Sequence, residues 1–233
     1  MTGSTKLYIV GVVKAILHVN SRNVVIVAAH PDDEVLGCGG TISKLIKSGH
    51  RVILLYLSSG DSQEERREKE ALRVCDFFQI SSHYFLRLKG PSFKVSSPNI
   101  QKVIRIFKLI TPTLVYINHD QESDYEHRIA FQLVTESYWR YNHQVSFEKR
   151  AMGIVLYEVH RLLLTHNLVE DISAEMDTKM KAMSLYHSQL KSTRWDLAIK
   201  GLNQYRGRLH NQMKFAEVFQ VKILNSILPY LHY

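Results

Sequence analysis

Four polar residues follow a buried apolar segment early in the chain, and their types suit metal-assisted hydrolysis. His30, Asp32, Asp33 and Glu34 come directly after the apolar residues 24–29. A histidine and a carboxylate three positions apart can converge on one divalent metal, while a neighbouring carboxylate is free to accept a proton. His30 and Asp33 are therefore the first candidate metal ligands, and Asp32 is the candidate general base.

The same residues also fit an ordinary helix start. Pro31 loses no needed N–H at a first helical position, and the carboxylates after it favour the positive end of the helix dipole. This interpretation leaves His30 unexplained, because histidine is a poor N-cap compared with Ser, Thr, Asp or Asn. We therefore place the metal-site interpretation first.

A second polar cluster follows another apolar segment at residues 113–117. It contains His119, Asp120, Asp124 and His127. Zinc in a hydrolytic site takes three protein ligands and leaves one position for water, so this cluster is expected to supply the third ligand. The residue types alone leave open which of the four it is.

Apolar strand-like segments alternate with helical patterns along the chain. Strands are expected at 24–29, 51–57, 84–86, 113–117, 152–159, 168–172 and 215–223, and helices at 41–48, 62–78, 98–110, 125–140, 173–190 and 195–209. This alternation predicts a single α/β domain, with a Rossmann-like, doubly wound, mostly parallel sheet covered by helices on both faces. Ligands of such sheets bind outside the carboxyl ends of the strands, where both polar clusters lie. Gly37, Gly39 and Gly40 are expected to form tight turns before the first helix.

Length and composition indicate one folded domain. The chain has 233 residues, of which 45% are hydrophobic and 22% charged, and this is enough for one sizeable core. The formal net charge of +8 raises nucleic acid, anionic lipid or a phosphorylated substrate as partners. The basic residues are dispersed and form no recognised nucleic-acid-binding signature, so we expect no nucleic acid partner.

The two cysteines and the N-terminal segment bear on location. Cys38 and Cys75 form no metal-type pair, which favours a reducing, cytoplasmic compartment. Residues 5–19 are expected to form an amphipathic helix within an N-terminal extension, residues 1–22, ahead of a domain at 23–233. That segment is too short and too charged to span a bilayer, and a membrane-surface contact is the minor alternative to packing on the domain. We also expect a homo-oligomer.

The first polar cluster resembles a known family signature. Residues 29–34, Ala-His-Pro-Asp-Asp-Glu, followed by Gly-Gly-Thr at 39–41, are similar to the LmbE/PIG-L family of zinc-dependent deacetylases that act on N-acetylglucosaminyl compounds. Weaker similarity follows at residues 56–61, 66–70, 171–172, 187–189 and 216–219.

The resemblance implies specific roles for residues of both clusters. It makes His30, Asp33 and His127 zinc ligands, and Asp32 the base that activates water for attack on the acetamide carbonyl. Arg67 matches a substrate-contacting arginine, and a guanidinium can bind sugar hydroxyls or phosphate. Tyr157, at the end of an expected strand, is a further candidate for the substrate pocket.

The chain departs from the family pattern at Asp124, where the resemblance implies a histidine that helps to stabilise the oxyanion or to handle protons. A carboxylate cannot stabilise an oxyanion, so the metal, a protonated His119 or another donor would have to do so. We keep Asp124 and His119 beside Asp32 in the expected catalytic set.

The leading hypothesis is a zinc-dependent hydrolase that removes acetyl from an N-acetylglucosamine-like, anionic amino sugar conjugate. The first alternative is a catalytically impaired carbohydrate-binding or regulatory protein on the same fold. The second is a nucleotide binder that uses residues 37–40 as a phosphate loop. That glycine pattern is not Gly-x-Gly-x-x-Gly, and acidic residues crowd it, so we rank the nucleotide binder last.

Overall fold

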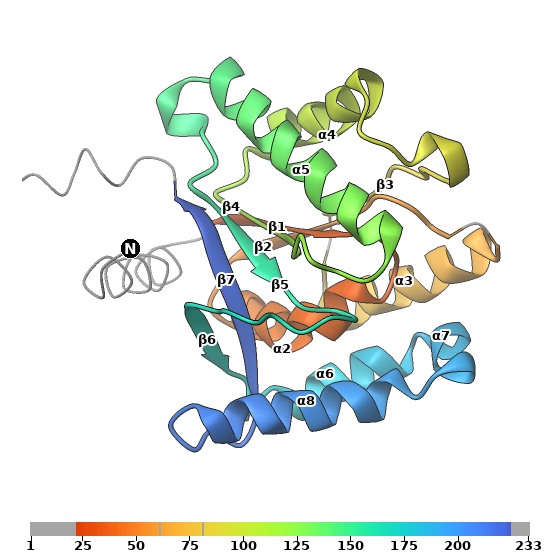
Figure 1. The fold of residues 1–233 in the computed structure, drawn as a ribbon, viewed down its shortest axis with the longest axis vertical. Coiled ribbons are helices and arrows are strands. Elements are labelled where there is room, and N and C mark those ends of the chain that lie inside the picture. Colours follow the sequence, from red (N-terminus) through yellow and green to blue (C-terminus); the bar gives the residue numbers. More distant parts are fainter. Residues whose placement is uncertain (1–21, 61, 81, 225–233) are drawn as a thin grey trace, which may run out of the picture.

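The computed structural model describes residues 22–60, 62–80 and 82–224. In this part of the chain, seven strands form one sheet in the order β3-β2-β1-β4-β5-β7-β6 (Figure 1). The strands are β1 (Asn23–Ala28), β2 (Arg51–Tyr56), β3 (Ser82–Phe85), β4 (Leu114–Asn118), β5 (Gly153–Tyr157), β6 (Leu168–Asp171) and β7 (Ala216–Leu224). The first five run parallel to one another, and β7 is antiparallel to both β5 and β6. The prediction of a mostly parallel sheet in a single α/β domain is confirmed.

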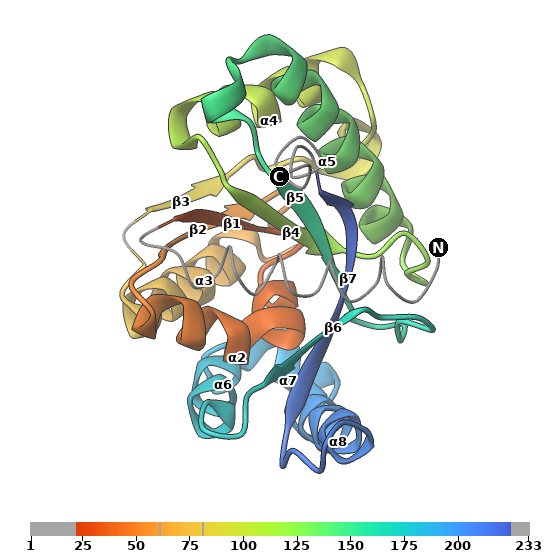
Figure 2. The same cartoon turned by 90° about the vertical axis from the view of Figure 1, so that its left-hand side faces the viewer.

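Helices cover both faces of the sheet (Figure 2). They are α2 (Asp33–Lys47), α3 (Glu64–Phe78), α4 (Ser97–Ile110), α5 (Tyr125–Gln144), α6 (Met176–Ser184), α7 (His187–Ser192) and α8 (Trp195–Leu209), with short 3-10 helices at Gly90–Ser92 and Phe147–Lys149. Helices α4 and α5 lie on one side of the sheet, and α2, α3, α6, α7 and α8 lie on the other.

The continuous apolar run of β1 follows from this sandwich. Val24, Ile26 and Ala28 belong to the core between the sheet and α2 and α3, whereas Val25 and Val27 belong to the core beneath α4 and α5. Both sets are buried, so neither face of the strand can carry a polar side chain. The first polar residues appear only where the strand ends.

The glycines after the first cluster do not form turns, and that prediction was wrong. Residues 37–40 lie inside α2, which runs unbroken from Asp33 to Lys47. A Cβ atom on Gly37 would come within 2.2 Å of the Tyr157 ring, and one on Gly40 within 2.6 Å of Ile172. These glycines therefore allow α2 to pack closely on its neighbours, and the run offers no open loop for a nucleotide phosphate.

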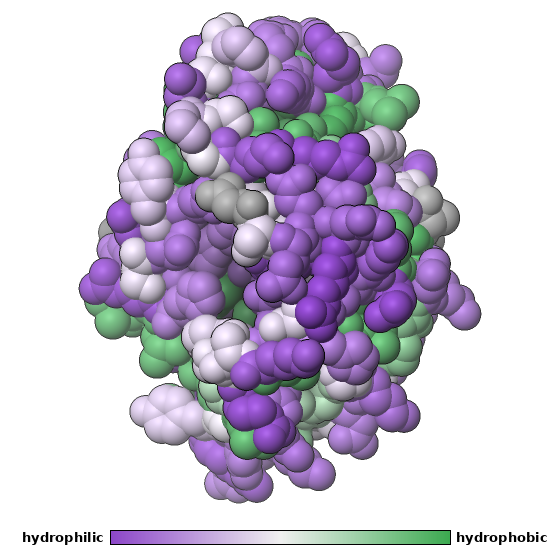
Figure 3. Space-filling model, turned by 90° about the vertical axis from the view of Figure 1, so that its right-hand side faces the viewer, coloured by the Kyte–Doolittle hydropathy of each residue, from purple (hydrophilic) through white to green (hydrophobic). Residues whose placement is uncertain are grey.

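The carboxyl ends of the parallel strands point to the right-hand side of Figure 1, and Figure 3 looks onto that side. The surface there is mostly hydrophilic, with apolar residues in smaller separate areas. None of the helices in the three described segments is long and apolar enough to cross a membrane. Cys38 and Cys75 are both buried and free. The expected helix at 5–19 lies outside the described residues.

Candidate active site

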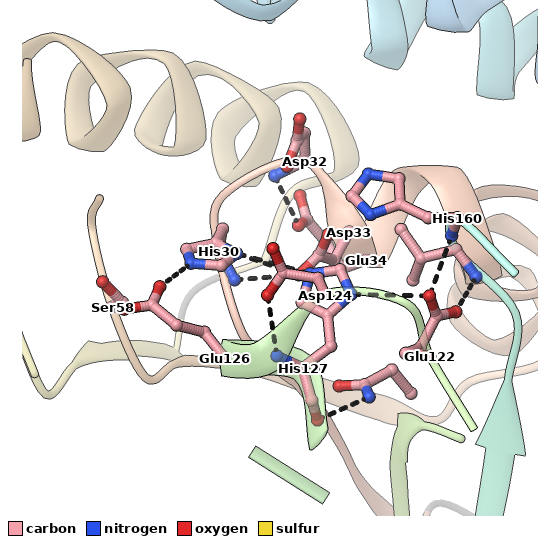
Figure 4. A network of polar contacts seen from close by, with 12 residues as sticks. His30, Asp32, Asp33, Glu34, Ser58, Glu122, Asp124, Glu126, His127 and His160 are labelled. Atoms are coloured by element: carbon pink, nitrogen blue, oxygen red, sulfur yellow. Dashed lines mark hydrogen bonds and ion pairs between the residues drawn. The ribbon is translucent and has the colours of Figure 1, made fainter. Parts of the chain in front are cut away.

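The two polar clusters meet at the carboxyl edge of the sheet (Figure 4). His30 follows β1, and Asp32 and Asp33 stand at the start of α2. His127 lies in the first turn of α5, which follows β4. Because β1 and β4 are adjacent and parallel, both polar ends reach the same place, although His30 and His127 are far apart in the sequence.

His30, Asp33 and His127 present three donor atoms toward one another. His30 Nδ1 lies 3.4 Å from His127 Nε2, and Asp33 Oδ2 lies 3.3 Å from that Nε2 and 3.9 Å from the Nδ1. Zinc bonds of about 2.0–2.2 Å would place tetrahedral ligand atoms about 3.3–3.6 Å apart. Two of the three separations match this spacing and the third is slightly longer, so the donor set fits a divalent metal.

Each imidazole of the cluster has a carboxylate behind it. His30 Nε2 lies 2.5 Å from Glu126 Oε2, and His127 Nδ1 lies 3.7 Å from Glu122 Oε2. In metal sites, a carboxylate on the outer nitrogen fixes the ring orientation and makes the inner nitrogen a better ligand. Neither glutamate was singled out from the sequence. Glu126 could have been, because it directly precedes His127.

The cluster is electrostatically suited to a positive charge. Burial opposes protonation of His127, but the Asp33 and Glu122 carboxylates outweigh it and raise the pKa of His127 to about 11. Burial also opposes ionisation of Asp33, yet His127 and His30 hold the pKa of that carboxyl below its usual range. A site that stabilises an imidazolium in this way would also stabilise a cation that takes the place of the proton.

Asp32 lies beside the three donors with an unusual backbone. Its φ of 120° is one that side-chain-bearing residues rarely adopt. Arg67 Nη2 donates to the Pro31 carbonyl at 3.0 Å and lies 3.5 Å from Asp32 Oδ1. Burial and the neighbouring Asp33 carboxylate raise the pKa of Asp32 well above its usual value, with Arg67 opposing the rise. A carboxyl with a raised pKa holds a transferred proton more readily.

Glu34 is hydrogen-bonded to the backbone at Asp32 and to two tyrosine hydroxyls. Its carboxylate accepts hydrogen bonds from the Tyr186 hydroxyl at 2.5 Å, the Tyr56 hydroxyl at 3.2 Å and the Asp32 N–H at 3.1 Å. The bond to the Asp32 N–H ties the buried glutamate to the strained residue. Glu34 is therefore a positioning residue for Asp32, and Tyr186 is a partner that no pattern in the sequence indicates.

Asp124 and His119, the other two residues of the expected catalytic set, make hydrogen bonds to backbone groups. Asp124 is the N-cap of α5, and its Oδ1 accepts from the His127 N–H at 3.1 Å. His119 is buried behind His127. Its Nε2 lies 2.6 Å from the Arg161 carbonyl, and its Nδ1 accepts from the Gln121 N–H at 3.1 Å. Both ring nitrogens of His119 are thus engaged, whereas Asp124 Oδ2 has no hydrogen-bond partner among the described residues.

Tyr157 is a core residue and does not line a pocket. It is completely buried, its hydroxyl donates to the Val27 carbonyl at 2.7 Å, and its ring covers Gly37. The expectation that it contacts substrate came from its place at a strand end. In a strand whose two faces are both covered by helices, however, a side chain near the strand end can still point into the core.

His160 is a further residue beside the cluster. Its ring stacks on His127, with centroids 5.0 Å apart and planes 13° from parallel, and its other neighbour is Trp195 at 4.9 Å. Glu122, His127 and His160 form a second group whose donor atoms lie within 4.8 Å of one another. The Glu122 oxygens already accept from the backbone N–H groups of residues 159–161, so this group suits a metal less well.

The family model of PIG-L, described as GlcNAc-PI de-N-acetylase, matches residues 25–138. The diacetylchitobiose deacetylase of Thermococcus kodakarensis is 27% identical over 250 residues, which cover 91% of this chain and 88% of that protein. These matches confirm the resemblance noted in the sequence.

Two solved structures share the fold. A conserved protein of Thermus thermophilus has a TM-score of 0.80 at 21% identity, with 90% of this chain and 98% of that chain covered. The N,N′-diacetylchitobiose deacetylase of Pyrococcus horikoshii has a TM-score of 0.74 at 20% identity, with 96% and 94% covered.

Proposed function

We propose that the protein is a zinc-dependent hydrolase that removes the acetyl group from an N-acetylglucosamine-like amino sugar conjugate. The match of the PIG-L family model to residues 25–138 supports this proposal. The convergence of His30, Asp33 and His127 beside Asp32 is the observation that carries the proposal. The similarity to a diacetylchitobiose deacetylase supports an N-acetylated amino sugar as the substrate.

His30, Asp33 and His127 would hold the zinc. When bound, zinc polarises a carbonyl oxygen and lowers the pKa of a water molecule toward about 7. Glu126 and Glu122 would orient the two imidazoles, since each lies at the outer nitrogen of one ring.

Asp32 is the proposed general base and then the general acid. It takes a proton from the attacking water as the water oxygen bonds to the acetamide carbon and the carbonyl π electrons move to oxygen. When those electrons return, the C–N bond breaks and its electron pair stays on nitrogen. Asp32 then protonates that nitrogen, so that a free amine and acetic acid leave, and the acid passes its remaining proton to the amine or to solvent. Its raised pKa suits both steps.

Arg67 is the proposed substrate-binding residue. Its guanidinium is mostly buried, lies beside Asp32, and has its Nε atom unpaired among the described residues. Such a group can bind a sugar hydroxyl or a phosphate. Together with the net charge of +8, this supports an anionic conjugate as the substrate. Homo-oligomerisation and a cytoplasmic location stay predictions from the sequence.

The second candidate function is a carbohydrate-binding or regulatory protein without turnover. The position of Asp124 favours it, because this carboxylate caps α5 and offers no hydrogen to an oxyanion. Ligand binding without release of amine would support this candidate over the hydrolase.

The test is amine and acetate release from a panel of N-acetylated sugars, both neutral and phosphorylated, by the zinc-loaded protein and its Asp32→Asn variant. We expect turnover by the wild type, faster on the phosphorylated members, and a loss of about 10²–10⁴-fold in the variant with zinc retained. Full activity in Asp32→Asn would rule out the proposed mechanism. Binding of the panel without any release would favour the second candidate.

A further inference from the structure

A hydrogen-bond donor at the acyl oxygen, in addition to a metal, speeds deacetylation because negative charge develops there as water adds. The polar side chains beside the cluster are largely engaged elsewhere. Asp124 accepts from the His127 backbone, and His119 uses both ring nitrogens on backbone groups. Arg67 binds the Pro31 carbonyl and faces Asp32, the proposed base. Arg67 is already the proposed residue for a sugar hydroxyl or a phosphate, so a hydrogen bond to the acyl oxygen would come from a different side chain.

His160 is the remaining histidine beside the cluster that could donate a hydrogen bond to the acyl oxygen. Its side chain is exposed, and its ring nitrogens make no hydrogen bond within the described segments of the chain. One of them lies within 4.8 Å of a His127 ring nitrogen and of a Glu122 oxygen, so the ring lies beside a proposed metal ligand. In Figure 4 the His160 ring lies on the same side of the cluster as Asp32. A ring N–H of His160 is thus available on the side where Asp32 would activate water.

The His160 ring is held in place from three directions. One of its faces stacks on His127, and Trp195 packs near the ring with centroids 4.9 Å apart. Its backbone N–H donates to Glu122 Oε2 at 3.2 Å, and Glu122 also accepts from the N–H of Val159 at 2.9 Å. A donor held in this way loses little entropy when it binds the developing charge, as electrostatic preorganisation requires.

We propose, resting on the deacetylase function above, that His160 is a catalytic residue that donates a ring N–H to the acyl oxygen of the substrate. As the water oxygen bonds to the acyl carbon, the π electrons of the carbonyl move to the oxygen that His160 contacts. When the C–N bond breaks, those electrons return to form the acetate carbonyl. His160 transfers no proton, so the proton count stays as written for Asp32.

Two variants separate hydrogen bonding from packing. His160→Phe keeps an aromatic ring between His127 and Trp195 but has no N–H, whereas His160→Gln keeps an N–H and loses the ring. His143→Phe, at an exposed site near the end of α5, is the matched control. With N,N′-diacetylchitobiose and zinc-loaded protein, we expect kcat to fall about 10²–10³-fold in His160→Phe, with KM changed little. His160→Gln should recover at least part of that loss, and His143→Phe should match the wild type.

A binding measurement tests the same contact without turnover. In a methylphosphonamide analogue of N-acetylglucosamine, a tetrahedral phosphorus with an anionic oxygen stands in for the attacked carbon. Calorimetry should show that His160→Phe binds this analogue about 10²-fold more weakly, while its affinity for N-acetylglucosamine stays close to that of the wild type.

The outcomes distinguish this proposal from the proposed function. If the wild type hydrolyses the substrate and prefers the analogue, and His160→Phe matches it in both, the role of His160 is overturned while the deacetylase function stands. If the wild type neither hydrolyses the substrate nor prefers the analogue, the deacetylase function fails, and the role of His160 fails with it.

Discussion

The Asp124 carboxylate accepts a hydrogen bond from the backbone N–H of His127, with 3.1 Å between Oδ1 and N. Asp124 is the N-cap of α5, so this bond orders the helical turn that carries the His127 ring. A residue expected to act in catalysis therefore has a clear structural role one turn away from a proposed metal ligand.

The effect of replacing Asp124 on the free energy of unfolding should depend on whether the new side chain can still accept a hydrogen bond from the His127 N–H. Asp124→Ala should lower the free energy of unfolding by about 1 kcal/mol, because removal of an N-cap side chain costs about 0.5–2 kcal/mol. Asp124→Asn keeps an acceptor and should stay near the wild type in both stability and turnover. Urea unfolding measures the difference. Equal losses in both variants would contradict the capping role.

Zinc binding should depend on His127. The wild type should hold about one zinc per chain, and His127→Ala should hold almost none, since two remaining ligands make a poor site. His143→Ala, which changes an exposed histidine of the same helix, is the control. Elemental analysis after dialysis measures the metal. Undiminished zinc in His127→Ala would rule out this ligand set.

Stability of the metal-free protein should depend on pH through Glu34. Burial raises the pKa of Glu34 from 4.5 to about 7, so the folded protein binds this proton more tightly than the unfolded chain does. The protonated side chain contributes its full stability below pH 4.5 and loses it as the pH rises through 7. Through Glu34, the free energy of unfolding should fall by about 3 kcal/mol over this pH range. The Glu34→Gln variant should not show this fall. Parallel urea titrations in chelator at pH 4.5 and pH 7.5 test this. Identical pH dependence in both proteins would contradict it.

Two glycines should respond oppositely to alanine. A Cβ at Gly37 would meet the Tyr157 ring at 2.2 Å, whereas one at Gly201 in α8 has no described atom within 4 Å. Gly37→Ala should therefore destabilise by about 1–3 kcal/mol through overpacking. Gly201→Ala should stabilise by about 0.5–1 kcal/mol through helix propensity. Thermal unfolding compares them, and stabilisation by both would show that α2 can move away from β5.

The sheet and its polar edge could be predicted because they depend on local patterns. The unbroken apolar run of β1 requires cover on both faces, and the polar residues that follow it have nowhere to lie except beyond the strand end. His30 and His127 could be paired because parallel strands deliver their ends to one edge.

The remaining features depend on contacts between distant elements. Position 37 requires glycine because the Tyr157 ring packs against it, and not because the chain turns there. The residues near Gly37 in the sequence do not indicate that contact. Likewise, the position of His160 follows from its stacking on His127 in α5 and from its hydrogen bond to Glu122, which lies between β4 and α5. Sequence spacing indicates neither contact.

The most direct test of the central claim is the rate of amine release from N,N′-diacetylchitobiose by chelator-treated protein, before and after one equivalent of zinc is added. We predict no release without metal and full recovery with zinc, while Asp32→Asn stays inactive in both conditions. Equal rates with and without zinc, or no release by the fully zinc-loaded wild type across the sugar panel, would contradict a zinc-dependent deacetylase.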